Sequence, residues 1–326
     1  EELHIQKSKY RKTIISPLRK YLRLVETTLQ KQDLHNIKYD CIPNVAFQKY
    51  FNVFKKRDEL SFNLYLKNTD VNAPKTSNIF PHNILREYRI FDTHEINKTL
   101  ETKWSYYLKN YQRVHITKTI PILHTSSSMY DDKDMFIRAI SLAIFIARKS
   151  DDPFNNLIIR NVEHAFQYIP QHEDVMTTMK SLIEYTEPSS IDMLSVMKKI
   201  VDNAKQNNLK TEDMPNTLIY ICDVDCIKKH ILKSAFSSKS VLMQKIQNLF
   251  EEHGYTSPRI IFFNMNAKSV SFPMLSNHHN VGMVSGYSPR VLNSLLYNDG
   301  ELFTCKTILN NILYKERYTS LRHLIK

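Results

Sequence analysis

Three polar side chains follow a short apolar run near the middle of the chain. The run extends from Ile120 to Leu123, and His124, Ser126 and Ser128 come after it. The two serines are two residues apart, so a turn can direct both hydroxyls at one point. Mg²⁺ prefers oxygen ligands, and an Asp two residues before Ser126 would complete a three-oxygen site. Because His124 occupies that position, the stretch predicts a metal site that lacks its carboxylate ligand.

The elements that must position these side chains are a strand, a loop and a helix. Ile120 to Leu123 reads as a buried strand, and an amphipathic helix is expected from residue 132 to 149. From residue 116 onward, strand and helix patterns alternate, which predicts an α/β fold with a doubly wound, mostly parallel sheet. Further strands are expected at 157–159, 165–169, 217–222, 259–264 and 282–285, and further helices at 174–185, 191–207, 241–252, 289–297 and 302–314. The loop after the first strand then lies at the edge of the sheet where ligands bind.

Residues 1–115 have a helical pattern, and 116–326 form the α/β domain. The segment 5–31 predicts one helix that breaks at Pro17, with Ser16 capping its second part. The segment 44–65 has aromatic residues at helical spacing, which is typical of a core-facing helix. Residues 67–83 are expected to form a surface loop, and residues 84–111 to resume helical structure around Trp104.

The net charge of +12 is concentrated in the first part of the chain. Residues 1–115 contain 21 Lys and Arg against 12 Asp and Glu, whereas the remainder contains 24 against 21. Such a distribution favours a polyanion as partner, namely RNA, DNA or an acidic protein surface, although it would also serve solubility. The candidate contacts are Lys9, Arg11, Lys12, Arg19, Lys20 and Arg23. The alternative is an amphipathic helix whose basic side chains remain solvated.

Several classes of function are disfavoured by composition. The four glycines are isolated, so no Gly-rich phosphate loop is expected. The four cysteines, at 41, 222, 226 and 305, lack zinc-site spacing and are expected to be buried free thiols in a reducing, cytoplasmic compartment. No apolar run is long enough to span a membrane, and no signal-peptide pattern is present. Because the chain begins at Glu1 without Met, we expect it to be part of something longer.

Residues 124–129, His-Thr-Ser-Ser-Ser-Met, resemble the Asp-x-Ser-x-Ser-Met metal-adhesion motif of von Willebrand A domains, with His124 in place of the first Asp. Other stretches resemble an uncharacterised family of plants and large DNA viruses, related to the Ro/TROVE proteins. They are Tyr10-Arg11-Lys12, Ser16-Pro17-Leu18-Arg19-Lys20-Tyr21, Ile42-Pro43, Asp223-Val224-Asp225, Gly254-Tyr255 with Pro258, Phe263-Asn264, and Val284-Ser285-Gly286-Tyr287. The resemblance implies a TROVE-like helical region, here incomplete, followed by a von Willebrand A-like domain.

The resemblance also implies that two further loops meet the first one over the metal. The second loop would offer Ser190 or Asp192, since Ile191 stands where the family has Thr, and the third would offer Asp223 and Asp225. With one carboxylate missing, we expect no bound metal. Weak Mg²⁺ binding is one alternative. A partial transition-metal site with His124 is another, because an imidazole suits such metals better than magnesium.

The function expected from these residues is non-enzymatic recognition or scaffolding, in a viral protein associated with the virion or its assembly. One alternative is an RNA-binding protein of the Ro type. Another is a metal-dependent hydrolase, for which His124, Ser126, Ser128 and Asp223 have suitable chemistry. His124 is only two residues from Ser126, however, and no Gly-x-Ser-x-Gly elbow is present, which disfavours a catalytic triad.

Overall fold

The computed structural model describes most of the chain, in two compact units. The described residues are 2–22, 24–30, 37–68, 80–88, 97–110, 116, 118–124, 127–160, 166–184, 193–225, 239–266 and 280–286. The helical unit comprises Glu1–Ile79 with Ser105–Asn110, and the α/β unit comprises Phe80–Trp104 with Tyr111–Lys326. The predicted helices at 289–297 and 302–314 lie outside the described residues.

The N-terminal helix differs from the sequence-based prediction at Pro17. Helix α1 (Glu2–Tyr10), a π-helical turn (Arg11–Ile15) and α2 (Ser16–Tyr21) follow one another without a break. Ser16 has helical dihedral angles and does not cap a new helix; its N–H donates to the carbonyl of Arg11. The prediction of a break and a Ser16 cap was therefore wrong. A π turn shifts the hydrogen-bond register just before Pro17, whose nitrogen has no hydrogen to donate.

The aromatic core of the helical unit was predicted correctly, but its helix is divided. Helices α4 (Asn44–Arg57) and α5 (Glu59–Asn68) are separated at Asp58, whose carboxylate accepts a hydrogen bond of 2.7 Å from the hydroxyl of Tyr39. Burial, followed by this hydrogen bond, raises the pKa of Tyr39. Four fully buried rings form the core, namely Phe47, Phe51, Phe54 and Phe62. Val45 lies off the stripe and is 72% exposed. Helix α3 (Val25–Gln30) and a 3₁₀ turn (Tyr39–Cys41) also belong to this unit.

A helical segment before residue 115 packs within the α/β unit. Helix α6 (Pro81–Leu85), a 3₁₀ turn (Arg86–Tyr88) and the first half of α7 (Lys98–Asn110) belong to it. Helix α6 packs on α9 (Lys133–Lys149), and Arg86 pairs with Asp134 at the start of that helix. Trp104 is buried, as expected for a residue within the core.

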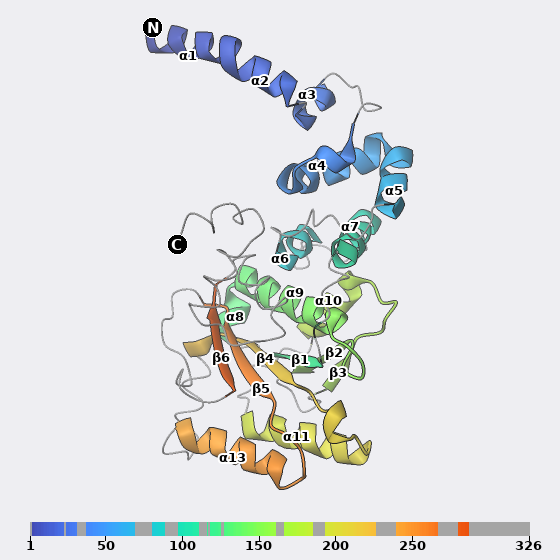
Figure 1. Cartoon of the computed structure of the whole chain (residues 1–326), viewed down its shortest axis with the longest axis vertical. Helices are drawn as coiled ribbons and strands as arrows, with labels where there is room; N and C mark the ends of the chain where they lie inside the picture. The colour runs from blue at the N-terminus through green and yellow to red at the C-terminus, as the bar shows by residue number, and fades with distance from the viewer. Residues whose placement is uncertain are drawn as a thin grey trace, which may run out of the picture. The chain divides into compact units, whose positions relative to one another are not determined.

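The α/β unit contains a six-stranded sheet in the order β3-β2-β1-β4-β5-β6 (Figure 1). Its strands are β1 (Thr119–Leu123), β2 (Leu157–Arg160), β3 (Phe166–Tyr168), β4 (Thr217–Cys222), β5 (Arg259–Asn264) and β6 (Val281–Ser285). All neighbouring pairs are parallel except β2 with β3. The expectation of a mostly parallel sheet in a mixed α/β fold is thus confirmed.

Helices cover both faces of this sheet (Figure 1). The side with α9 also carries α10 (Val175–Glu184), and the other side carries α11 (Met193–Gln206) and α13 (Lys239–Glu251). Alternate residues of β1 and β4, such as Ile122 and Tyr220, share one apolar cluster with Met197 of α11 and Phe250 of α13. Because strands buried on both faces must be apolar on both, β1 and β4 read as continuous apolar runs. A short helix, α8 (Ser127–Asp131), precedes α9.

The ends of the predicted helices are defined by local chemistry. The carboxylate of Asp132 accepts hydrogen bonds from the N–H groups of Asp134 and Met135, both at 3.1 Å, and so begins α9. Helix α13 ends in a left-handed turn at Gly254, which has φ of +75°, as predicted.

Within the described residues, no helix combines the length and apolar character needed to cross a membrane. Cys222 is a buried free thiol, whereas Cys41 is free but exposed, contrary to expectation.

Candidate recognition site at the carboxyl edge of the sheet

Buried polar residues gather where the parallel strands end. His124 follows β1 and Asp223 follows β4, and these strands are neighbours with Leu123 opposite Ile221. The N–H of His124 donates to the carbonyl of Ile221 at 3.0 Å. His124 is 1% exposed and Asp223 is 3% exposed. The structure therefore places these two predicted residues at the same edge of the sheet, on adjacent strand ends.

Both the backbone and the ring of His124 contact the neighbouring strand β4 of the sheet. Its imidazole lies 6.3 Å, between ring centroids, from Tyr220, which in turn lies 5.7 Å from Phe262. The ring thus continues the apolar interior of the sheet towards the edge. A carboxylate at this position would carry its charge into buried surroundings and would need a cation or strong donors beside it. A histidine avoids that requirement because an imidazole has an uncharged form.

The Asp223 carboxylate accepts hydrogen bonds from its own loop and from the loop that follows β5. One of its oxygens, Oδ1, accepts the N–H of Asp225 at 3.1 Å and a side-chain N–H of Asn266 at 3.4 Å. The first contact spans two residues, as in an Asx turn, and fixes the direction in which the chain leaves β4. Asp223 therefore serves to shape the loop, and Asp225, which is half-buried, lies beyond it.

A network centred on Asn264 connects the ends of β4, β5 and β6. Its side-chain oxygen accepts the N–H groups of Val224 at 3.3 Å and Asn266 at 3.0 Å. Its side-chain nitrogen donates to the carbonyl of Asn266 at 2.8 Å and to the hydroxyl of Ser285 at 3.3 Å. Asn264 is fully buried, so these bonds satisfy an amide that would otherwise destabilise the core. These hydrogen bonds connect the third predicted loop to the ends of β5 and β6.

Sequence reasoning did not select Asn264, Asn266 or Ser285 as site residues. The available signal was a polar residue ending an otherwise apolar strand, as Asn264 does in β5. Arg160, at the end of β2, was also missed. Its guanidinium is buried and donates to the carbonyl of Leu182 at 2.9 Å and to that of Ser181 at 3.3 Å. Because it satisfies the last carbonyls of α10, its charge has a structural use.

The other predicted site residues are only partly placed. Ser128 lies in α8, where the structure describes its backbone only. Ser126, Ser190 and Asp192 lie outside the described residues. Among the described residues of this site, one imidazole and two carboxylates could act as ligands, and one oxygen of Asp223 already accepts two hydrogen bonds. Among the residues that the structure describes, no group of three His, Cys, Asp or Glu side chains is arranged to hold a metal ion.

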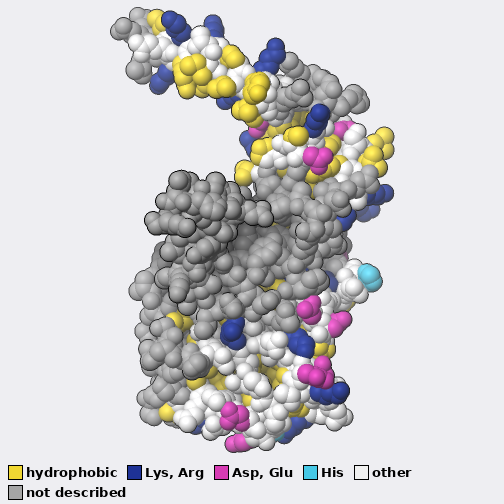
Figure 2. Space-filling model, in the orientation of Figure 1, with side chains coloured by type: hydrophobic (Ala, Val, Ile, Leu, Met, Phe, Trp, Pro, Cys, Tyr) yellow, Lys and Arg dark blue, Asp and Glu magenta, His cyan; other side chains and the backbone are white. Residues whose placement is uncertain are grey.

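The basic residues predicted to contact a polyanion lie on the N-terminal helix. The five that are described are all exposed, namely Lys9, Arg11, Lys12, Arg19 and Lys20, while Arg23 lies outside the described residues. Figure 2 shows Lys and Arg side chains projecting from this helix, and hydrophobic side chains exposed between them. No acidic residue occurs from Leu3 to Val25. Within its described part from Leu3 to Leu22, this helix therefore presents a basic surface that contains no acidic residue.

Two family models cover most of the chain. One, described as a domain of unknown function (DUF2828), matches residues 1–115, and another, described as a domain of unknown function (DUF7788), matches residues 118–315. The chain is also similar to "Uncharacterized protein L728" of Acanthamoeba polyphaga mimivirus, with 24% identity over 93% of this chain and 54% of that protein. The chain thus spans about half the length of this relative. No solved structure matches it. Since the second model covers more than half of its residues, the chain belongs to the DUF7788 family of domains of unknown function.

Proposed function

We propose that this chain is a non-enzymatic recognition protein whose α/β unit is of the von Willebrand A kind and binds a partner through the carboxyl edge of its sheet. The observation that carries the proposal is the buried imidazole of His124 beside the strand end that bears Asp223. In this proposal, His124 replaces a metal-binding carboxylate. The edge then keeps its shape through hydrogen bonds and does not depend on a metal ion.

The sheet topology supports this interpretation. In the strand order β3-β2-β1-β4-β5-β6, the chain reverses its direction of winding between β1 and β4. In open α/β sheets, ligands bind beside such a reversal, outside the carboxyl ends of the strands. His124 and Asp223 follow the two strands on either side of it. A recognition surface is therefore proposed at this point and at the adjoining ends of β5 and β6.

Hydrolysis is a weaker explanation of the same residues. A catalytic carboxylate or nucleophile needs a partner directed at a substrate. Asp223 instead directs one carboxylate oxygen towards Asp225 and Asn266 of its own and the neighbouring loop. This engagement supports a structural use of the residue. Turnover that disappears in an Asp223→Ala variant would favour the hydrolase.

Added Mg²⁺ or Mn²⁺ at millimolar concentration is expected to leave the melting temperature of the wild-type chain unchanged. An ion that binds the folded state would raise it, because binding adds to the free energy of unfolding. A His124→Asp variant, which restores the carboxylate, is expected to gain an upward shift of about 2 °C or more. Differential scanning fluorimetry measures both effects. A reproducible rise in the wild type that Asp223→Ala abolishes would overturn the proposal, whether or not His124→Asp folds.

A role in a virion or in its assembly is part of the proposal. It is supported by the mimivirus relative, which carries no assigned activity in its description. The partner proposed for the carboxyl edge is a protein. Purification from the native source with and without nuclease would separate a directly bound protein from one bridged by RNA.

A second candidate function, RNA binding of the Ro type, is favoured by the exposed basic surface of the N-terminal helix. A filter-binding titration against salt tests it. As a scaffold, the chain should bind RNA weakly and with a steep dependence on salt, whereas an RNA-end reader should retain sub-micromolar affinity at physiological salt.

Variants of the N-terminal helix test whether its basic surface contacts the RNA. Replacing Arg11, Lys12, Arg19 and Lys20 with Ala should reduce the salt slope by about 0.7 for each RNA phosphate that the variant no longer neutralises. The matched control replaces the exposed Lys198 and Lys205 of α11. An unchanged slope in the helix variant would rule this surface out.

A further inference from the structure

A cavity of about 440 Å³ lies at the opposite edge of the sheet from the recognition site. It is bounded by Ile120 near the start of β1, by Leu157 at the start of β2, and by Met214, which precedes β4. Tyr168 of β3 pairs with Leu157, because β3 is antiparallel, and so lies at this same edge. Because it lies at this edge, the cavity is separate from His124 and Asp223. Its volume is in the range that accommodates a small organic ligand.

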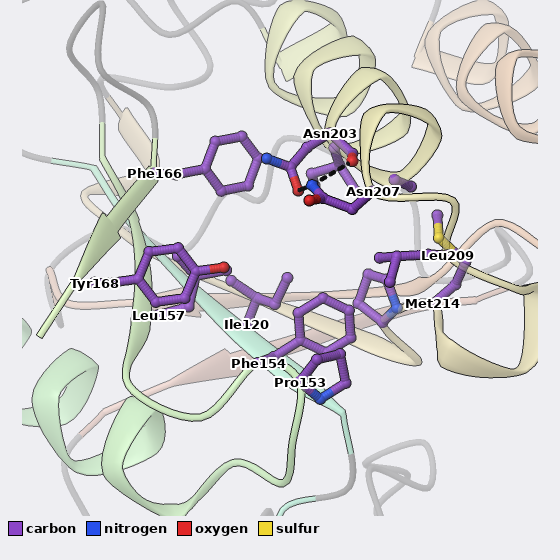
Figure 3. A pocket seen from close by; sticks show the side chains of 13 residues that line it. Ile120, Pro153, Phe154, Leu157, Phe166, Tyr168, Asn203, Asn207, Leu209 and Met214 are labelled. Carbon is purple, nitrogen blue, oxygen red and sulfur yellow. Dashed lines mark hydrogen bonds between the residues drawn. The ribbon is translucent and has the colours of Figure 1, made fainter. Parts of the chain in front are cut away.

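Apolar side chains form the base and two walls of the cavity (Figure 3). Ile120, Leu157 and Met214 are at most 3% exposed and provide its base. The rings of Phe154, Phe166 and Tyr168 surround the open space, and Tyr168 is 61% exposed, so the cavity opens to solvent beside it. Such surroundings favour a planar aromatic ring, which can contact these rings by stacking or through its edge.

Two amides border the cavity, that of Asn203 in the last turn of α11 and that of Asn207 just after this helix. Asn207 donates from Nδ2 to the backbone oxygen of Asn203 at 2.9 Å and to its Oδ1 at 3.2 Å. Within the part of the chain that the structure describes, the Nδ2 donor of Asn203 and the Oδ1 acceptor of Asn207 make no hydrogen bond. Each amide thus has one hydrogen-bonding group available to a ligand, a donor on Asn203 and an acceptor on Asn207. A ring edge that carries both an acceptor and a donor complements these two groups.

The ligand should carry no charge. None of the thirteen residues that line the cavity is Asp, Glu, Lys, Arg or His, although these types are abundant in the chain. A charged ligand would lose its hydration on entering and find no counter-charge among these residues. From the apolar base, the aromatic walls and the paired amides, we propose that this cavity binds an uncharged heteroaromatic ring of the nucleobase type, with its hydrogen-bonding edge at Asn203 and Asn207.

Adenine is a suitable probe, and purine, which lacks the exocyclic amino donor, is its matched analogue. Titration of the full chain, labelled in the methyl groups of Ile and Met, should shift the NMR signals of Ile120, Ile200 and Met214, all of which line the cavity. Purine should bind about tenfold more weakly, since the absence of a hydrogen bond of about 1.4 kcal/mol changes the dissociation constant by that factor. Toluene, which has no hydrogen-bonding edge, should bind more weakly still.

Two variants test the assignment of residues. Ala204→Leu, which places a larger side chain in the cavity wall, should abolish the shifts, and Asn203→Leu should weaken adenine binding at least tenfold while leaving toluene unaffected. Asn248→Leu, at an exposed position on α13, is the control and should change nothing. The proposal is overturned by any of three results: no shifts at these methyls, toluene binding as tightly as adenine, or shifts that persist in both cavity variants.

Discussion

Replacing Glu101 with Ala is expected to lower the free energy of unfolding of the α/β unit by about 3 kcal/mol. The Glu101 carboxylate accepts the N–H of Val175 at 3.1 Å and that of Met176 at 3.4 Å, the first two residues of α10. It also accepts the hydroxyl of Tyr88 at 2.7 Å. The first N–H groups of a helix have no partner within the helix, and a negative charge there is favourable. Alanine would remove all three hydrogen bonds together.

Urea unfolding of the variant gives the change in stability, and hydrogen exchange locates it. The amides of Val175 and Met176 should exchange faster in Glu101→Ala than in the wild type. Glu101→Gln, which keeps an acceptor but loses the charge, should have an intermediate effect. The control is Lys98→Ala, one turn earlier on α7 at an exposed position. Equal exchange of these two amides in Glu101→Ala and the wild type would show that the carboxylate does not hold α10.

Acidification from about pH 6.5 to pH 4 is expected to remove up to about 3 kcal/mol of stability through His82 alone. His82 lies in α6 and is buried, with its ring 5.0 Å from that of Phe80 between centroids. Burial is the main cause that lowers the pKa of His82 to about 4. The positive charges of Arg138 and Arg86 act in the same direction, and Asp134 opposes them.

The sign of the effect follows from which state binds the proton. Between pH 4 and the ordinary pKa of about 6.5, the unfolded chain is protonated at His82 and the folded chain is not. Lower pH therefore favours the unfolded state over this interval. Above pH 6.5 neither state binds the proton, and the stabilisation is fully present.

The pH dependence of urea unfolding in the wild type should be compared with that of a His82→Phe variant. Phenylalanine keeps an aromatic ring against Phe80 but cannot be protonated. The decrease in the free energy of unfolding between pH 6.5 and pH 4 should therefore be smaller by up to about 3 kcal/mol in this variant. His172→Gln, which removes an exposed imidazole, should leave the dependence as in the wild type. Parallel curves for His82→Phe and the wild type would contradict the assignment.

The candidate site was accessible to sequence reasoning only in part. His124 and Asp223 each follow an apolar run, so their position at a sheet edge could be inferred from the order of strands and helices. Asn264 could not be assigned the same importance, because two of its four hydrogen bonds reach Val224 and Ser285 at the ends of two other strands. Nothing in the spacing of residues along the chain reveals that these segments meet.

The amino-acid sequence by itself determined the strands β1, β4 and β5, the aromatic core of the helical unit and the left-handed end of α13 at Gly254. Each of these depends on periodic burial or on backbone preferences that act over a few residues. Only the tertiary structure decided that the Glu101 carboxylate accepts the first N–H groups of α10 and that Asp58, between α4 and α5, accepts a hydrogen bond from Tyr39. It also decided that α6 packs on α9. Those features depend on partners 19 to 75 residues apart or on packing between elements, and local preferences carry no information about such distant contacts.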